Sequence, residues 1–474
     1  MLEKIRGAVT DITSHWKKPA QGKYIPYKEF AAYSVGGIGV NTINSLFGYV
    51  ALNANCLLIG SAYGIKPTHL AWLNILMGII NLVKAPFISM LIDNTNSKYG
   101  KFRPYLLYTG VPTAILLCLM AFIPNNINYG AKVAVISVTY AFLMIFQALY
   151  AQAFTSIAQV LTPNGEERTG LLSVSMFIYS LGPSIVNMLL PILSRLTGGM
   201  TDFRTYRIFF PIFSIAGIAL SIITFSGTKE KIVVAKDYVA KVKFSTGIKQ
   251  VAKNKYFWLI NIHSILSGLK YGIGSILGWY CIYQIKSDEM LGIMNTVIGT
   301  ASVPLMLLAP LLAKKLGKRN VLIWTNLIRA VFCVVMLFTM DNTIVFFICL
   351  YLATLTLGGD SVITTSMTAE IFDYQQWKTG VRLEGFITQL GGMLTTLAGM
   401  FTGLIIPYFY EHYGLHNDYT VLYDAAVRTP IFNILIITSI ISCVVCVIPI
   451  FFYDLKEKDH QKIIEELKVR ADEN

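Results

Sequence analysis

The chain has 474 residues, of which 54% are hydrophobic and only 14% are charged, and its mean hydropathy is +0.58. Soluble globular domains carry about a quarter charged residues, so this composition excludes an ordinary soluble domain. The formal net charge of +13 would suit a nucleic-acid partner, but the positions of the basic residues along the chain argue against one.

Apolar residues occur in blocks of about 20 or more, the length that a helix needs to cross a ~30 Å hydrocarbon layer. The first 30 residues are polar and lack the apolar core of a signal peptide, so we expect no cleavage. The sequence therefore predicts an all-α polytopic membrane protein with twelve transmembrane helices. The predicted spans are 30–58, 69–93, 104–125, 131–160, 169–195, 206–226, 255–285, 289–313, 321–340, 342–368, 383–410 and 428–453.

Lys and Arg residues are divided unequally between the two sides of the predicted membrane. Twenty-nine of the 39 fall in the tails and in alternate connections, seven fall on the other side, and three fall within spans. This asymmetry follows the positive-inside rule and predicts that both termini lie in the cytoplasm. The positive charge is thus explained by membrane topology, and we expect no nucleic-acid partner.

The two halves of the chain resemble each other. A Gly-Lys pair follows both span two (Gly100-Lys101) and span eight (Gly317-Lys318), and a Thr-Gly pair follows or ends the connections after spans four and ten. Repeated six-span halves are typical of secondary transporters, which bind their solute near the membrane midplane between the repeats. The predicted parts are a six-helix bundle at 1–226, an amphipathic cytoplasmic linker at 227–253, a second, pseudo-symmetric six-helix bundle at 254–453 and a cytoplasmic tail helix at 454–474.

Three motifs mix acids, bases and glycine at predicted cytoplasmic helix ends, at 93–104, 162–170 and 372–385. Such charged groups can hold helix ends together in one conformational state and release them in another. The alternative is that they are ordinary solvated loop charges. The predicted cytoplasmic gate consists of Asp93, Lys101, Arg103, Arg168, Asp373, Lys378, Arg382 and Glu384.

These motifs, together with Phe225-Ser-Gly-Thr-Lys-Glu230 at the end of span six, resemble those of the glycoside–pentoside–hexuronide:cation symporters. This family is the branch of the major facilitator superfamily that includes the melibiose permease. The Asp-Tyr…Trp-Lys-Thr-Gly…Arg-x-Glu-Gly run within 373–385 is the most specific match, and the resemblance covers nearly the whole chain. It implies the major facilitator fold, a place in the bacterial inner membrane, and import of a glycoside or related solute, usually driven by sodium or protons.

The chain departs from the carboxylate pattern of that family. Aligned on the motifs, Asn41 stands where the melibiose type has a sugar-binding acid, and Asn81 and Ala85 stand at the two cation-binding acids. Ala151 replaces an acid of span four, and Thr396 replaces a lysine of span eleven. Because the carboxylates that would hold sodium are missing, we expect transport to be sodium-independent, and either proton-coupled or uncoupled.

Lys84 lies inside span two, about nine residues or 13 Å from its predicted cytoplasmic end. A charge deep in a span costs at least ~2.5 kcal/mol and usually faces a cavity or a partner. Three interpretations remain open. The side chain snorkels toward the cytoplasm, its ammonium substitutes for the coupling cation, or it contacts an anionic group of the solute.

Further ionisable residues lie within spans seven, nine and ten, namely Lys270 with its neighbour Tyr271, Arg329 and Asp360. Three bases against one acid, with Lys84 included, predict an electropositive cavity that favours an acidic glycoside over a neutral one. The alternatives are that Arg329 pairs with Asp360 and that Lys270 reaches the outer interface. His263 of span seven could relay a proton, or it could be a packing residue.

Amide, hydroxyl and aromatic side chains in a dry cavity suit the hydroxyl groups and ring of a sugar. Interhelical hydrogen bonding is the alternative role for such residues. The predicted substrate-binding residues are Asn41, Lys84, Gln152, Lys270, Tyr271, Asp360 and Thr396.

Enzyme functions find little support in the sequence. Its six histidines show no metal-binding spacing, and no glycine-rich phosphate loop or nucleophile elbow occurs. We therefore expect no catalytic residues, no metal site and no cofactor. The predicted function is secondary active transport of a glycoside or hexuronide-like solute by a monomer in the lipid bilayer. A transporter of a non-sugar organic anion is the alternative, and a membrane-embedded enzyme a more distant one.

Overall fold

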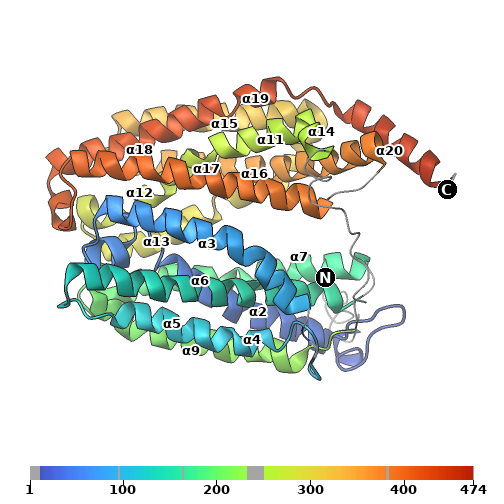
Figure 1. Ribbon diagram of the computed structural model, residues 1–474, viewed down its shortest axis with the longest axis horizontal. Helices are drawn as coiled ribbons and strands as arrows, with labels where there is room; N and C mark the ends of the chain where they lie inside the picture. Colours follow the sequence, from blue (N-terminus) through green and yellow to red (C-terminus); the bar gives the residue numbers. More distant parts are fainter. Residues whose placement is uncertain are drawn as a thin grey trace, which may run out of the picture. The chain divides into compact units, whose positions relative to one another are not determined.

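The computed structural model describes residues 11–93, 95, 97–162, 165–231, 250–380 and 384–472. Within these ranges the chain forms helices and connecting segments, and no strand occurs (Figure 1). Up to residue 231 the helices are α2 (Tyr27–Gly48), the π-helix η1 (Leu57–Ala62), α3 (Pro67–Asp93), α4 (Tyr105–Tyr108), α5 (Gly110–Phe122), α6 (Tyr129–Val160), α7 (Gly165–Tyr179), α8 (Leu181–Ser194) and α9 (Phe203–Gly227).

From residue 250 onward the order of elements repeats the same theme of long helices joined by short turns. These helices are α11 (Lys255–Leu266), the 3-10 helix η2 (Gly268–Ser275), α12 (Ile276–Trp279), the π-helix η3 (Tyr280–Ile285), α13 (Asp288–Thr300), α14 (Ser302–Leu316), α15 (Lys318–Phe338), α16 (Thr343–Thr379), α17 (Glu384–His412), the 3-10 helix η4 (Tyr419–Tyr423), α18 (Ala425–Val445), α19 (Ile448–Phe451) and α20 (Glu457–Asp472).

Eight helical segments of the described chain are long and apolar enough to cross a membrane, at Tyr105–Phe122, Tyr129–Val160, Val174–Ser194, Phe203–Gly227, Asp288–Leu316, Lys318–Phe338, Thr343–Thr379 and Ala425–Phe451. The four remaining predicted spans correspond to α2, to α3, to the interrupted run from α11 to η3, and to α17. The prediction of an all-α polytopic membrane protein is therefore confirmed.

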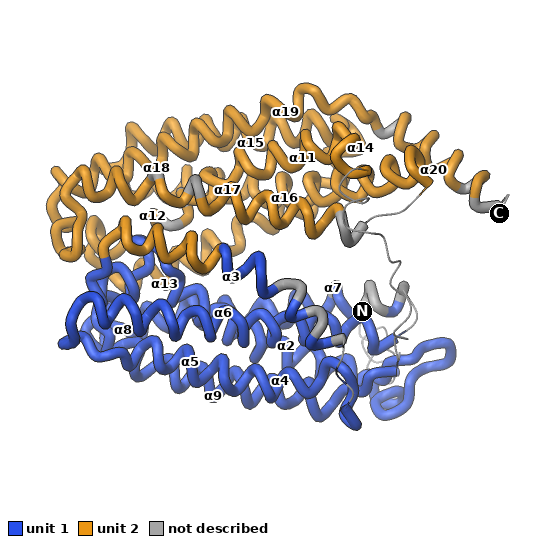
Figure 2. Tube along the Cα trace, in the orientation of Figure 1, with its two compact units in different colours: residues 1–65, 79–239 blue, residues 66–78, 240–474 orange. Residues whose placement is uncertain are grey.

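The contacts divide the chain into two compact units (Figure 2). Unit 1 comprises residues 1–65 and 79–239, and unit 2 comprises residues 66–78 and 240–474. The first part of α3 belongs to unit 2, where the backbone N–H and the hydroxyl of Thr68 donate to Glu411 Oε1 at 3.1 and 2.6 Å. The sequence-based division at 226 and 254 assigned all of this helix to the first half.

Predicted span one differs from the structure in where it ends, and predicted span seven in the regularity of its helix. Span one ends at Gly48 rather than at residue 58, and a separate π-helix follows at Leu57–Ala62. Span seven is not one helix, because 3-10 geometry replaces α-helical geometry at Gly268–Ser275. Glycines at 268, 272, 274 and 278 lower the helix propensity of this stretch. Irregular backbone is tolerated in a membrane only where other groups satisfy its hydrogen bonds.

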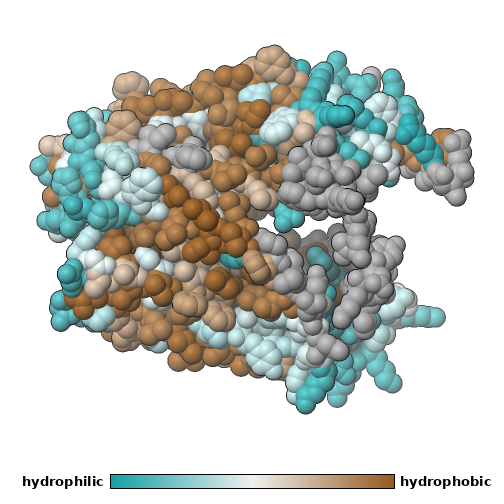
Figure 3. All heavy atoms as spheres, viewed as in Figure 1, coloured by the Kyte–Doolittle hydropathy of each residue, from teal (hydrophilic) through white to brown (hydrophobic). Residues whose placement is uncertain are grey.

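Large apolar side chains remain on the outer surface of the long helices. Ile215, Leu307 and Phe338 are 71%, 72% and 81% exposed. Figure 3 shows apolar residues over the sides of the helices and hydrophilic residues gathered near helix ends. Lipid tails are as apolar as these side chains, so such exposure is the expected condition of a membrane protein.

Small residues allow α2 and α9 to approach closely in unit 1. A Cβ atom at Gly39 would overlap the main-chain oxygen of Gly217, and one at Gly36 would overlap Thr224. Thr224 also donates its hydroxyl hydrogen to the carbonyl of Ala32 at 3.0 Å. Close contact between small residues is a main source of helix association in membranes, where lipid removes the hydrophobic driving force.

We expect Gly39→Ala to lower the stability of the protein, because the new methyl group forces α2 and α9 apart. Overpacking of this kind costs roughly 1–3 kcal/mol. Gly48→Ala is the matched control, since no atom lies within 4 Å of a Cβ built at that exposed helix end. The midpoint of thermal unfolding in detergent measures the effect, and equal midpoints for the two variants would contradict the packing argument.

Candidate functional site

A fully buried ion pair lies among the helices of unit 2. Lys270 Nζ is 2.6 Å from Asp360 Oδ2, and the two side chains are 0% and 7% exposed. Lys270 lies in the interrupted segment η2, and Asp360 lies in the middle of α16. The structure therefore brings together two residues that the sequence singled out separately. Of the two alternatives considered above, Asp360 pairs with Lys270 and not with Arg329, and Lys270 does not reach outward.

Asn326 of α15 completes the ion pair. Its side-chain oxygen accepts a hydrogen bond from Lys270 Nζ at 2.9 Å, and its side-chain nitrogen donates to Asp360 Oδ1 at 2.8 Å. Cys446 Sγ lies 3.3 Å from the same Asn326 oxygen. Both oxygens of Asp360 thus accept a direct hydrogen bond, which is the condition for a buried carboxylate to remain charged. Sequence reasoning missed Asn326, although its place in an apolar span was a usable signal.

Arg329 stabilises the irregular backbone beside the ion pair. Its guanidinium donates to the carbonyl of Ala353 at 2.9 Å and to the carbonyl of Lys270 at 3.0 Å. The Lys270 carbonyl lies in the 3-10 segment, where the regular helical hydrogen-bond pattern is interrupted. The N–H of Lys270 donates to the hydroxyl of Ser442 in α18 at 3.1 Å. The buried arginine therefore supports the backbone that carries Lys270.

His263 of α11 lies beside the same carboxylate and is 1% exposed. Its Nε2 is 3.8 Å from Asp360 Oδ1 and 3.4 Å from the hydroxyl of Ser267. Its Nδ1 is 2.7 Å from the carbonyl oxygen of Cys446. The imidazole is therefore held between a backbone acceptor on one side and the ion pair on the other.

A cavity of about 240 Å³ opens next to this network. Hydroxyl groups dominate its lining, beside the imidazole and the carboxylate. The lining residues are His263, Ser264, Ser267, Tyr271, Asp360, Ser361, Thr364, Thr365 and Thr395. Side chains of this kind can both donate to and accept from the hydroxyl groups of a sugar, and the ring of Tyr271 can pack on a sugar face.

Lys84 lies in a different environment in unit 1. It is half-buried in an apolar groove of about 380 Å³ between α3 and α6, lined by residues such as Val83, Phe87 and Ile145. Its Nζ donates to the carbonyl of Met144 at 3.0 Å. Among the residues that the structure describes, no carboxylate lies within 4.0 Å of this ammonium. The side chain thus reaches sideways to α6, which does not fit snorkelling toward the helix end.

The other predicted substrate residues make local contacts. The side-chain nitrogen of Asn41 donates to the carbonyl of Gly37 at 3.0 Å, and that of Gln152 donates to Ser156 at 3.3 Å. Thr396 donates to the carbonyl of Gly392 at 2.8 Å within α17. Of the predicted former cation-site positions, Asn81 is exposed, and the side chain of Ala85 lies outside the described residues. The hydrogen bonds described for Asn41, Gln152 and Thr396 therefore stay within their own helices.

The predicted gate residues Lys101 and Arg103 are held by an acid that sequence reasoning did not assign to the gate. Glu230, just beyond α9, accepts hydrogen bonds from the backbone N–H groups of Lys101, Phe102 and Arg103 at 2.8, 2.8 and 2.9 Å. The guanidinium of Arg103 also donates to the carbonyl of Phe225. Burial lowers the pKa of Arg103, against the opposing effect of the Glu230 charge.

The described gate residues of unit 2 contact the tail helix α20 and a neighbouring side chain of α16. Asp373 Oδ2 lies 2.9 Å from Nε2 of His460 in α20, and Lys378 lies over the ring of Tyr374. The neighbouring acid Glu370, which was not predicted, pairs with Lys318 and accepts from the hydroxyl of Tyr453. Arg382 lies outside the described residues, as do the side chains of Asp93, Arg168 and Glu384.

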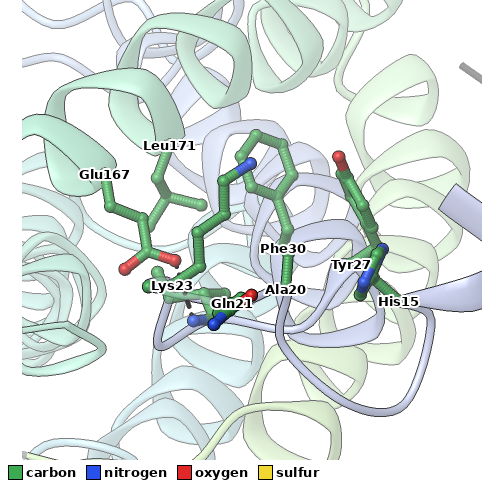
Figure 4. A pocket seen from close by; sticks show the side chains of 10 residues that line it. His15, Ala20, Gln21, Lys23, Tyr27, Phe30, Glu167 and Leu171 are labelled. Carbon is green, nitrogen blue, oxygen red and sulfur yellow. Dashed lines mark hydrogen bonds between the residues drawn. The ribbon is translucent and has the colours of Figure 1, made fainter. Parts of the chain in front are cut away.

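A third unpredicted acid, Glu167 of α7, holds the segment that precedes α2. Its carboxylate accepts from the backbone N–H groups of Tyr24 and Ile25 at 3.1 and 2.8 Å. Glu167 also borders a pocket of about 480 Å³. Figure 4 shows Lys23 and Phe30 among the side chains that line this pocket. The contacts with Tyr24 and Ile25 give Glu167 of the 162–170 motif a local structural role.

Long apolar helices and a buried charged network beside a hydroxyl-lined cavity define a polytopic membrane transporter. A family model described as "MFS/sugar transport protein" matches residues 32–457, and the chain belongs to that family. This places it in the major facilitator superfamily, whose fold has twelve transmembrane helices in two six-helix bundles, as predicted. The family is one of transporters, and the prediction that the chain is not an enzyme is confirmed by this membership.

Individual proteins agree with this assignment. The chain is 27% identical to the isoprimeverose transporter of Lactiplantibacillus pentosus over 77% of this chain and 76% of the relative. It is 23% identical to the glucuronide carrier protein homolog of Escherichia coli over 94% of this chain and 96% of the relative. Its fold is similar to that of a D-xylose-proton symporter, with a TM-score of 0.58 at 15% identity over 90% of this chain and 97% of the other.

We expect removal of either member of the Lys270–Asp360 pair to destabilise the protein strongly. Lys270→Met leaves a buried carboxylate without its cation, and breaking a buried pair in this way costs roughly 3–5 kcal/mol. The double variant Lys270→Met/Asp360→Asn removes both charges and should recover most of that loss. Thermal unfolding of the purified parent protein and of both variants measures the effect.

Lys255→Met is the matched control for this series. Lys255 is also 2.6 Å from a carboxylate, that of Asp454, but both side chains are more than half exposed. Exposed pairs contribute roughly 0–1 kcal/mol, so this variant should unfold close to the parent temperature. A double variant at 270 and 360 that is no more stable than Lys270→Met would contradict the assignment of the pair.

Proposed function

We propose that the chain is a secondary active transporter that imports a glycoside or hexuronide-like solute by alternating access. The observation that carries the proposal is the hydroxyl-lined cavity at His263, Tyr271 and Asp360 in a member of a sugar-transporter family. The relatives named for isoprimeverose and glucuronide carry a glycoside and an acidic sugar derivative, which supports the same solute class here.

The proposed setting is the bacterial inner membrane, with both termini in the cytoplasm and a monomer as the working unit. The orientation rests on the excess of Lys and Arg in the tails and alternate connections. We propose that the eight charged gate residues predicted from the sequence lie on the cytoplasmic side. Glu230, Glu370 and His460 are added to this gate, because they hold Lys101, Lys318 and Asp373 in place.

An acidic solute is favoured over a neutral one by the charges within the spans. Lys270 is neutralised by Asp360, so the positive excess within the spans resides on Lys84 and Arg329. Lys84 and Arg329 donate hydrogen bonds to backbone carbonyls. Because a carbonyl carries no net charge, the positive charges of these two side chains stay uncompensated. A solute carboxylate would supply the missing negative charge. A non-sugar organic anion is the second candidate, on the same observation at Lys84.

The proposed solute-contacting residues are Asn41, Lys84, Gln152, Lys270, Tyr271, Asp360 and Thr396, with His263 and Ser267 added from the lining of the cavity. We propose that sodium is not the coupling ion. Hard cations such as sodium prefer carboxylate and carbonyl oxygens. Asn41, Asn81, Ala85 and Ala151 offer no carboxylate at the positions where the melibiose-type pattern has acids.

Counterflow in proteoliposomes, with sodium and proton gradients held at zero, tests this function. We expect methyl β-glucuronide to exchange, methyl β-glucoside to exchange more weakly, and sodium to leave both rates within about twofold. Lys84→Met should raise the glucuronide Kd at least about tenfold if the ammonium binds the solute carboxylate, because a charged hydrogen bond contributes roughly 1.5–3 kcal/mol.

Lys253→Met is the control for the lysine substitution, because Lys253 is exposed and lies outside the proposed site. If Lys84→Met instead makes exchange depend on added sodium, the ammonium stands in for the coupling cation. Sodium-dependent uptake by the parent protein with a fixed stoichiometry would refute sodium independence. Formation of a chemically altered solute would refute transport as the activity.

A further inference from the structure

We infer that Nε2 of His263, in the second half of the chain, is the atom that binds the coupling proton. The inference rests on the proposed function and assigns a place to its coupling ion. The starting point is the hydrogen bond at the other ring nitrogen. Nδ1 lies 2.7 Å from the Cys446 carbonyl oxygen, which can only accept, so Nδ1 carries a hydrogen in every protonation state.

This hydrogen bond leaves Nε2 of the neutral ring with a free lone pair. Nε2 lies 3.4 Å from the Ser267 hydroxyl, which can donate to it, and 3.8 Å from Asp360 Oδ1. His263, Ser267 and Asp360 all line the 240 Å³ cavity, so a proton can reach Nε2 from the space that the solute would enter. The imidazole is therefore a base poised between the cavity and a carboxylate.

Asp360 is less suited to hold the proton itself. Its Oδ2 accepts from Lys270 at 2.6 Å and its Oδ1 accepts from Asn326 at 2.8 Å. Both contacts favour the charged carboxylate over the neutral acid. Among the titratable groups of this cluster, the neutral imidazole is the one that changes charge most readily near neutral pH.

The charges around His263 explain how the solute and the proton depend on each other. Lys270 of η2, Arg329 of α15 and Asp360 of α16 give a net charge of about +1, and Tyr271, Cys443 and Cys446 are the neutral titratable groups that complete the surroundings. Protonation of the imidazole would add a second positive charge to this cluster, and it is disfavoured while Asp360 is paired with Lys270. A solute carboxylate or hydroxyl group that draws Lys270 away leaves Asp360 free to stabilise the imidazolium.

Solute binding and proton binding at Nε2 therefore favour each other. By thermodynamic reciprocity, a solute that promotes proton uptake binds more tightly when the proton is present. The step moves one proton from water to Nε2 on loading and returns it on release, with no covalent change in the solute. One proton would accompany each solute molecule.

Proton uptake on solute addition tests the inference. We would add methyl β-glucuronide to purified protein in weakly buffered detergent solution and record the pH change, and measure glucuronide affinity between pH 6 and 8. We expect about one proton per bound solute and an affinity that tightens by up to about tenfold per pH unit of acidification, as one linked proton requires. In His263→Gln, both signals should vanish.

Counterflow distinguishes a variant that has lost proton coupling from one that has failed to fold. Any exchange of glucuronide that His263→Gln retains at zero gradient should no longer vary with pH between 6 and 8, and the variant should not accumulate solute when a proton gradient is imposed. His416→Gln is the control, since that exposed histidine lies in a connection after α17. If His263→Gln does not fold, His263→Asn and His263→Ser provide the same comparison.

The outcomes distinguish this inference from the proposed function. Proton uptake that persists in His263→Gln, or that is absent in a parent protein which exchanges glucuronide, overturns the assignment of His263 and leaves transport intact. If the parent exchanges neither glycoside at any pH and takes up no proton, the proposed function fails and the inference fails with it.

Discussion

The buried ion pair between Lys270 and Asp360 is the constraint on which the arrangement of unit 2 depends. Moving two charges into a low-dielectric interior costs several kcal/mol per ion even after relaxation, and only close contact with additional hydrogen bonds offsets that cost. Asn326 supplies those bonds to both ions at once. The lysine reaches this position from an irregular segment, so its backbone needs a donor from elsewhere, and Arg329 provides one. Four polar residues that lie in three separate apolar spans are therefore parts of one structure.

Much of the fold was predictable because membrane helices leave strong signals in a sequence. Runs of apolar residues gave the spans, and the Gly-Lys repeats gave the internal duplication. The predicted end of span one at residue 58 was wrong, and the prediction of one helix at 255–285 missed its change to 3-10 and π geometry. Hydropathy averages over about 20 residues and does not detect a change of hydrogen-bond pattern within an apolar run. The glycines at 268, 272 and 274 are the local signal for this change, because they lower helix propensity.

The sequence predicts several residues of the site, but it does not predict which of them contact each other. Rare ionisable residues inside spans identified Lys270 and Asp360, since such residues are costly and usually functional. Their pairing was not predictable, because the spans contain three bases that could pair with Asp360. The distance from each base to the carboxylate depends on how the helices pack. Glu230 was missed as a gate residue for a similar reason. It acts through backbone N–H groups of a loop about 130 residues earlier, and no local pattern reports such a contact.

The two buried lysines show how environment separates chemically identical groups. Lys270 has a carboxylate and an amide as partners and is neutralised locally. Lys84 has one backbone carbonyl in an apolar groove, so its ammonium keeps an uncompensated charge within the first unit. A hydrogen bond to a carbonyl satisfies one of three donors and none of the charge. The first arrangement contains its own counter-charge, whereas no described carboxylate lies within 4.0 Å of the second. An acidic solute would complete it, and this asymmetry is the physical basis for proposing a carboxylated glycoside.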